Sequence, residues 1–389
     1  MAKLIEITGK ALSGEWGTDD ETGDGIPVLR TTNFTNEGVV DYRNVVTRTI
    51  TKKKIEEKYL RKGDIIIEKS GGSDKQPVGR VIFFDGPEQT YLFNNFTGLL
   101  RVKDQTTWYP RYVFYSMYSN YRRGGTRAFE NKTTGLHNLK TDDYVSRYEV
   151  SETSMENQME ICERLDRLYG IIKMRQQELQ KLDELIRARF VELFGDPVSN
   201  SYGLPELALS ELGELGRGVS KHRPRNDSKL MNGDYPLIQT GDVAAANLYI
   251  TSYNSTYSDL GLKQSKMWNK GTLCITIAAN IAKTAILDFN ACFPDSVVGF
   301  IANDKTTNIF IHYWFSFFQA ILESQAPESA QKNINLKILS ELKVIVPDKN
   351  KQDEFTEFIY QVNKSKVAVQ KALDETQILF DSLMQKYFG

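Results

Sequence analysis

The 389-residue chain has little cysteine, little histidine, almost no net charge and no long apolar run. Three cysteines (Cys162, Cys274 and Cys292) and three histidines are scattered without zinc-ligand spacing, which favours a reduced, cytosolic setting. No apolar run approaches the roughly 18 residues of a membrane span, and MAKLIEITGK lacks the features of a secretory signal. The net charge of −1 means that any nucleic-acid binding must rest on local basic patches.

Motifs of nucleic-acid enzymes are also missing. The chain has no Pro-Pro dipeptide, which excludes the Asp/Asn-Pro-Pro-aromatic motif of amino-methyltransferases. The stretch TGKA at Thr8–Ala11 lacks the glycine spacing of a phosphate-binding loop. Glu68 and Lys69 are adjacent, so one strand cannot present both on one face as the Glu-x-Lys of a restriction-type nuclease would. We therefore expect no catalytic residue, metal or cofactor in this chain.

What the chain does contain is a repeat. Ile26–Phe34 reads IPVLRTTNF and Tyr235–Val243 reads YPLIQTGDV, while Lys62–Ile67 (KGDIII) is answered by Lys270–Ile275 (KGTLCI). Further pairs follow in the same order: Trp108–Tyr121 with Ile309–Leu322, His137–Lys140 with Ile334–Lys337, Tyr148–Val150 with Val344–Pro347, and Leu193–Gly195 with Tyr387–Gly389. The sequence thus predicts a tandem duplication, with strands after each Lys-Gly and a buried helix in each aromatic segment. The first copy departs from the second in two places. Its start lacks the apolar-glycine opening that LALSELGELGRG gives the second copy, and its Val150–Ser151 junction has no proline where the second copy has Pro347.

Each copy ends in a long stretch with apolar residues at alternating steps of three and four. This spacing is typical of a coiled-coil seam, and two such seams are most simply buried against each other. The seam residues are Leu165, Leu168, Ile172, Leu179, Leu182, Ile186 and Leu193 in the first copy, and Phe355, Ile359, Val362, Val369, Leu373, Phe380, Leu383 and Tyr387 in the second. We expect a mixed α/β (α+β) fold in which two similar globular domains, residues 1–150 and 198–348, are separated by an antiparallel pair of helices, residues 151–197 and 349–389, related by a pseudo-two-fold axis.

Basic, glycine-containing stretches in both copies are candidates for DNA binding. Arginine and lysine suit phosphate oxygens and guanine edges, and Gln or Asn suits adenine, although polar turn residues often only satisfy the backbone. The candidates in the first copy are Lys69, Ser73, Lys75, Gln76, Arg80, Arg122, Arg123 and Arg127, with Asn33 as a possible reader of adenine. The candidates in the second copy are Lys221, His222, Arg223, Arg225, Asn226 and Gln239.

This layout resembles the specificity subunit of type I restriction-modification systems over essentially the whole chain. The motifs that carry the resemblance are the repeated nine-letter stretches, the KGD and KGT strand entries, and the passage INLK…VIVPDKNKQDEF. LDELIRARFVELFGDP and LDETQILFDSLMQKYFG resemble the helix ends of that family. No motif is specific by itself, whereas their order and duplication together are.

The resemblance implies a non-catalytic, cytoplasmic reader of double-stranded DNA that recognises a split target, one half per recognition domain. It implies two methyltransferase (M) subunits that modify adenine N6, joined by motor-nuclease (R) subunits, with S-adenosylmethionine, ATP and magnesium belonging to those partners. Two alternatives stay open. One is the specificity half of a separately encoded methyltransferase or nuclease of another restriction class, and the other is a coiled-coil protein scaffold that binds no nucleic acid.

Overall fold

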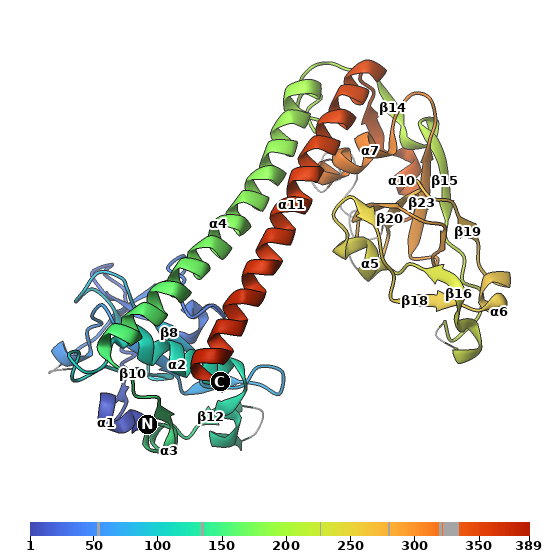
Figure 1. The fold of residues 1–389 in the computed structure, drawn as a ribbon. Helices are drawn as coiled ribbons and strands as arrows, with labels where there is room; N and C mark the ends of the chain where they lie inside the picture. The colour runs from blue at the N-terminus through green and yellow to red at the C-terminus, as the bar shows by residue number, and fades with distance from the viewer. Residues whose placement is uncertain (53–54, 134–135, 226, 279–280, 319–320, 322–333) are drawn as a thin grey trace. The chain divides into compact units, whose positions relative to one another are not determined.

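Contacts in the computed structural model divide the chain into two compact units, which we describe separately. The structure describes residues 1–52, 55–133, 136–225, 227–278, 281–318, 321 and 334–389. Unit 1 comprises Met1–Gln176 together with Lys371–Gly389, and unit 2 comprises Gln177–Gln370. Figure 1 shows the elements of both units. Each unit has its own main hydrophobic core, because no residue of either main cluster comes from the other unit among the described residues.

Unit 1 is built on small, mostly antiparallel sheets. Its central strand, β6 (Ile65–Glu68), is buried at every residue and lies between β10 and β8 in the order β2-β10-β6-β8. The other sheets have the orders β3-β5-β4-β9, β11-β12-β7 and β1-β13. The strands are β1 (Ala2–Lys3), β2 (Leu12–Ser13), β3 (Thr18–Asp19), β4 (Ile26–Leu29), β5 (Val46–Thr49), β7 (Ser70–Gly72), β8 (Val81–Phe83), β9 (Leu92–Phe93), β10 (Thr97–Leu100), β11 (Glu130–Thr133), β12 (Leu136–Leu139) and β13 (Glu149–Val150), and the short helices are α1 (Leu4–Thr8), α2 (Pro110–Arg122) and α3 (Thr141–Arg147).

Unit 2 repeats this arrangement. Its central strand, β20 (Leu273–Thr276), is again buried throughout and lies in the order β15-β23-β20-β21-β17, beside sheets of order β18-β16-β22-β19 and β14-β24. The strands are β14 (Glu206–Ala208), β15 (Gly213–Arg217), β16 (Met231–Leu237), β17 (Tyr249–Ile250), β18 (Ser255–Tyr257), β19 (Met267–Trp268), β21 (Thr284–Leu287), β22 (Ala291–Cys292), β23 (Val297–Ala302) and β24 (Lys343–Ile345), and the short helices are α5 (Thr240–Ala245), α6 (Asp259–Lys263), α7 (Asn308–Trp314) and α10 (Leu336–Glu341).

The predicted duplication is confirmed by strand pairing. In unit 1 the strand that carries IPVL, β4, pairs in parallel with β9, and in unit 2 the strand that carries YPL, β16, pairs in parallel with β22. The two Lys-Gly motifs lead into β6 and β20, each flanked by antiparallel partners. The aromatic segments form α2 and α7. Part of the second aromatic segment lies outside the described residues.

The first copy does have the opening that the sequence seemed to lack. Strand β1 pairs with β13 and β2 with β10, as β14 pairs with β24 and β15 with β23. The backbone N–H of Leu4 donates to Tyr148 O at 2.8 Å, and that of Leu209 donates to Leu342 O at 2.9 Å. The expectation was wrong because KLIEITGKALSG lies at the same place in the first copy as LALSELGELGRG in the second, although its residues differ.

Both long helices have 40 residues, α4 over Met155–Phe194 and α11 over Lys349–Phe388 (Figure 1). Gly195, which follows α4, has φ +76, the left-handed conformation that glycine adopts without strain at a helix C-terminus. In unit 2 two ion pairs join the helices, Asp183–Lys366 (2.6 Å) and Arg189–Glu354 (2.6 Å). The later residue of α4 therefore pairs with the earlier residue of α11. The helices therefore run antiparallel in this unit. Among the described residues no helix is both long and apolar enough to cross a membrane.

The two helix ends pack in equivalent ways. In unit 2 the ring of Phe194, at the end of α4, lies 5.1 Å from that of Phe310 on α7. In unit 1 the ring of Phe388, at the end of α11, lies 5.1 Å from that of Tyr112 on α2. The equivalence shows that the repeat includes the helices, and that each helix ends in the core of the unit opposite to the one where it begins.

Candidate nucleic-acid interface

The segment of unit 2 between β15 and β16 carries most of the second-copy candidates. Arg225 forms an ion pair with Asp295 at 2.5 Å, and Arg223 lies 3.6 Å from the same carboxylate while donating to Ser220 O at 2.7 Å. About half of each arginine side chain remains exposed, at 55 % for Arg223 and 47 % for Arg225. Both can therefore meet a partner while Asp295 holds them near the surface.

The same segment is braced at its base. The backbone N–H groups of Lys221 and His222 both donate to Gln264 Oε1, at 2.7 and 3.1 Å. Asp227 accepts from the backbone N–H of Lys229 and lies 3.1 Å from His222 Nε2, and these two contacts lower the pKa of its carboxyl. Asn226 lies outside the described residues. The bracing leaves the side chain of Lys221 exposed.

A pocket of about 320 Å³ is lined both by this segment and by the second nine-letter motif, Tyr235–Val243. Its lining includes Ser220 and Arg225 from the basic segment and Gln239 and Thr240 from the motif, with Tyr257 beside them. Gln239 is exposed, and its amide donates to Ser255 Oγ at a long 3.3 Å, while its backbone N–H donates to Asp242 Oδ2 at 2.8 Å. A forked cation and an amide thus lie at one concave surface, a combination that suits phosphate and base edges.

In unit 1 a tight turn gathers Ser73, Lys75 and Gln76. The backbone N–H of Ser73 donates to Gln76 O at 2.7 Å, and that of Gln76 donates to Ser73 Oγ at 3.2 Å. Arg127 reaches the turn through a long bond of 3.4 Å to Asp74 O. All four candidate side chains are exposed, so the turn presents two cations and two polar groups together.

A buried pair fixes this turn from beneath. Glu130 accepts from the backbone N–H of Val78 at 3.0 Å, and its other oxygen lies 3.1 Å from His137 Nδ1. The second nitrogen of His137 lies 3.6 Å from Asp74. The side chains of Glu130 and His137 are only 4 % and 7 % exposed, so they position the turn rather than meet a partner. This pairing was not predictable from the sequence, since Asp74 and His137 are 63 residues apart.

Three other arginines of the first copy are used inside unit 1. Arg80 donates to Phe34 O and Thr31 O, each at 2.9 Å, and pairs with Glu68 at 3.2 Å. Arg122 pairs with Asp381 at 2.7 Å, and Arg123 donates to the backbone oxygen of Phe388. These residues attach the end of α11 and the first nine-letter motif, so we leave them out of the proposed DNA contacts.

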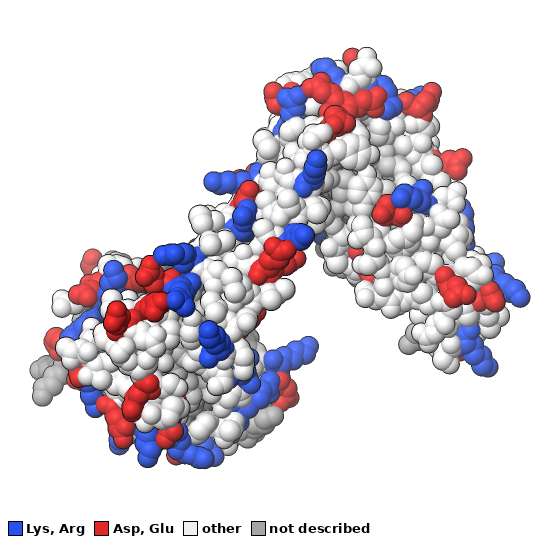
Figure 2. All heavy atoms as spheres, in the orientation of Figure 1, with Lys and Arg blue, Asp and Glu red and all other residues white. Residues whose placement is uncertain are grey.

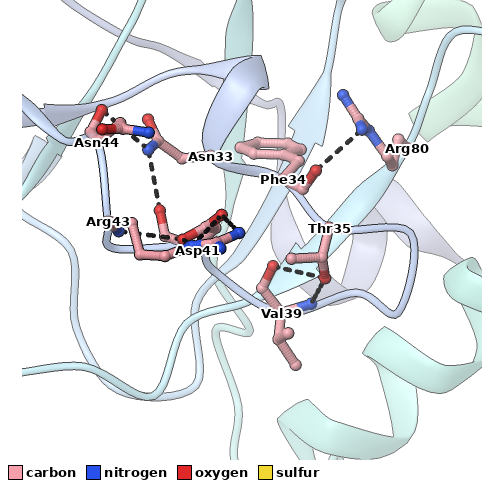
Figure 3. A network of polar contacts seen from close by, with 8 residues as sticks. All are labelled: Asn33, Phe34, Thr35, Val39, Asp41, Arg43, Asn44 and Arg80. Carbon is pink, nitrogen blue, oxygen red and sulfur yellow. Dashed lines mark hydrogen bonds and ion pairs between the residues drawn. The ribbon is translucent and has the colours of Figure 1, made fainter. Parts of the chain in front are cut away.

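Asn33 and Lys69 also have internal partners. Figure 3 shows the Asn33 amide directed at the 41–44 segment, where Nδ2 donates to Asp41 O at 2.9 Å; its oxygen accepts from the backbone N–H of Arg30. Asn33 is 2 % exposed, so it stabilises the motif and cannot read adenine there. Lys69 donates to Ser13 Oγ at 2.8 Å, and partial burial lowers the pKa of its amine.

Asp64 and Glu68, the acidic residues that come nearest to the Glu-x-Lys pattern of a restriction-type nuclease, are likewise paired with arginines. Asp64 pairs with Arg101 at 2.7 Å, and Glu68 pairs with Arg80. Burial raises the pKa of Glu68, an effect that Arg80 opposes. Among the described residues no group of three or more His, Cys, Asp or Glu side chains is placed to hold a metal ion.

The exposed charges do not form one continuous basic surface on the face drawn in Figure 2, where Lys and Arg alternate with Asp and Glu. On this face the exposed cations of the 218–230 segment and the Ser73–Gln76 turn are therefore local candidates for contact with a polyanion, not parts of a broad basic surface.

A model of the type I restriction modification DNA specificity domain matches residues 2–184 and 206–376. The chain belongs to this family. The two matched ranges correspond to the two copies found in the sequence and in the sheets. Family membership assigns the chain to target recognition in a type I restriction-modification complex, as a specificity subunit, and specificity subunits are themselves non-catalytic.

Solved structures have the same fold. The S subunit of a type I restriction-modification system from M. genitalium is similar over 100 % of this chain and 95 % of its own, with 15 % identity and a TM-score of 0.61. A chain from a structure describing complex assembly and conformational transition of the type I R-M system is similar over 100 % of this chain and 96 % of its own, with 16 % identity and a TM-score of 0.56.

Proposed function

We propose that this specificity subunit reads a two-part DNA target, with one part for each copy of the recognition domain, residues 1–150 and 198–348. The observation that carries the proposal is the repetition of one sheet topology in two units, each with its own core and its own exposed basic site. Two similar domains with different surface residues are suited to reading two different short sequences.

The chemistry in this proposal belongs to partners. Two methyltransferase subunits that modify adenine N6 bind along α4 and α11, and motor-nuclease subunits join the complex through them. Exposed apolar side chains on these helices, such as Met174, Leu185, Val367 and Ile378, support a partner surface there. S-adenosylmethionine, ATP and magnesium act in those subunits.

The test is a map of methylated adenines in a host that expresses this chain with its methyltransferase partners. We expect one target made of two fixed parts and an unspecified spacer. The variant Gln239→Ala should relax one part of the target and leave the other unchanged, because Gln239 lies in unit 2 alone. The control is Thr256→Ala, on strand β18, which pairs with the strand of the motif and lies in the same unit.

Two outcomes contradict the proposal. A continuous target would show that the copies do not read separate parts. The absence of any binding by the purified complex to random duplex DNA would favour the protein scaffold. A DNA-binding subunit should bind random duplex through its phosphates, with a steep salt dependence, even without sequence recognition.

A further inference from the structure

The two units carry a loop at the same fold position, and the loops have opposite charge. Residues 14–25, a loop that includes the two-residue strand β3, connect β2 to β4, and residues 218–230 connect β15 to β16. The second residue of each is held alike: the backbone N–H of Glu15 donates to Phe93 O at 2.8 Å, and that of Val219 donates to Phe293 O at 3.2 Å. The loops are therefore structural counterparts, although their sequences differ.

The loop of unit 1 is acidic. It contains Glu15, Asp19, Asp20, Glu21 and Asp24 and no lysine or arginine. Cations from outside the loop pair with two of these residues, Lys52 and Lys58 with Glu15 and Arg48 with Asp19, so its acidic character rests on Asp20, Glu21 and Asp24. The loop of unit 2 contains Lys221, Arg223, Arg225 and Lys229 with Asp227 as its one acidic residue. Every stretch of a DNA duplex presents phosphates of the same charge, so a loop that attracts phosphate in one unit has a counterpart that repels it in the other.

Unit 1 has its basic site at a different connection. Residues 69–80 join β6 to β8, whereas the shorter stretch 277–283 joins β20 to β21 in unit 2. The extra length of the first connection forms the Ser73–Gln76 turn, which the buried Glu130–His137 pair holds and to which Arg127 bonds. The basic site is thus lengthened and anchored in the unit whose first loop is acidic.

We propose that the two units bind DNA through non-equivalent loops. Unit 2 uses residues 218–230, unit 1 uses the Ser73–Gln76 turn with Arg127, and residues 14–25 stay away from the phosphates. This inference rests on the proposed function, because it takes double-stranded DNA as the partner of both units.

The experiment measures binding of the full chain, in complex with its methyltransferase subunits, to a labelled random duplex over a range of salt concentrations. Three variants are compared: R223A/R225A, K75A/R127A and E21Q/D24N. The matched control, K140A/K337A, removes two charges from exposed, equivalent positions of the two copies that lie outside both long helices. Glu21 and Asp24 are chosen because Asp20 accepts bonds from Gly23 and Gly25 and so shapes its loop.

Each basic pair should flatten the slope of log affinity against log salt by about 2 if both side chains contact phosphate. E21Q/D24N and K140A/K337A should leave the slope unchanged. Tighter binding by E21Q/D24N would overturn the inference, since the acidic loop would then lie at the duplex. An unchanged slope for K75A/R127A would overturn it as well, provided that the wild-type complex binds. If the wild type itself does not bind, the proposed function fails instead.

Discussion

Replacing Phe190 by alanine tests how the end of α4 is held in unit 2. Phe190 is 1 % exposed, and its ring centroid lies 4.9–5.5 Å from those of Phe194, Phe310, Phe317 and Phe355. Phenylalanine-to-alanine changes in packed cores cost about 3–5 kcal/mol, and the loss of ring contacts adds to the loss of buried area. We therefore expect a destabilisation of about 4 kcal/mol for unit 2.

Amide hydrogen exchange measured by mass spectrometry separates the two units. Exchange through cooperative opening follows the local free energy, so 4 kcal/mol corresponds to about a thousandfold faster exchange of the most protected amides. The effect should appear in β20 and β23 of unit 2 and should be absent from β6 and β10 of unit 1, because the two cores share no residues among those described.

The neighbouring residue provides the control. Val191 is 37 % exposed, so Val191→Ala should change stability by no more than about 0.5 kcal/mol. Equal effects of the two variants, or equal acceleration of exchange in both units after Phe190→Ala, would refute the assignment of this ring cluster to an independent core.

Three further predictions concern pH, salt and length. Burial and the nearby Lys366 lower the pKa of His312 to about 4. Because the unfolded chain therefore binds the proton at higher pH than the folded chain, the free energy of unfolding should fall as pH drops from about 6.5 to 4. The variant His312→Gln should flatten this part of a plot of melting temperature against pH. Arg122→Ala should leave the salt slope of DNA binding unchanged and cost at most about 1 kcal/mol in thermal unfolding, because its partner is Asp381; a flatter slope would return Arg122 to the interface. If the helices set the distance between the two parts of the target, inserting four residues at 175–178 should lengthen the preferred spacer by about one or two base pairs, since the helix grows by roughly 6 Å; methylation mapping that shows the old spacer would exclude this role.

The fold was largely predictable because the sequence contains the same series of motifs twice. Repeated short motifs fixed the strand entries β6 and β20, and the heptad spacing predicted both long helices. The roles of individual cations were not predictable. Arg122 and Arg123 resemble a basic DNA-binding loop in sequence, yet their partners Asp381 and Phe388 lie more than 250 residues away.

The candidate site shows the same limit. Sequence reasoning grouped Arg80 with Lys75 and Gln76 because they are neighbours in the chain. Arg80 donates to the backbone oxygen of Phe34 (Figure 3) and to that of Thr31, whereas residues 73–76 of the turn are exposed. Composition marks where cations occur, whereas backbone geometry decides which of them remain available.

Unit 1 is made of two separate stretches of the chain, and this affects the order in which the two units can be completed during synthesis. Its two pieces, residues 1–176 and 371–389, are separated by all of unit 2. At about 5–20 residues per second, the ribosome needs roughly 10–40 s to make the intervening stretch. Through that time the aromatic surface around Tyr112 lacks the ring of Phe388 that later packs against it. The half of the molecule that is translated first is therefore the half that is completed last.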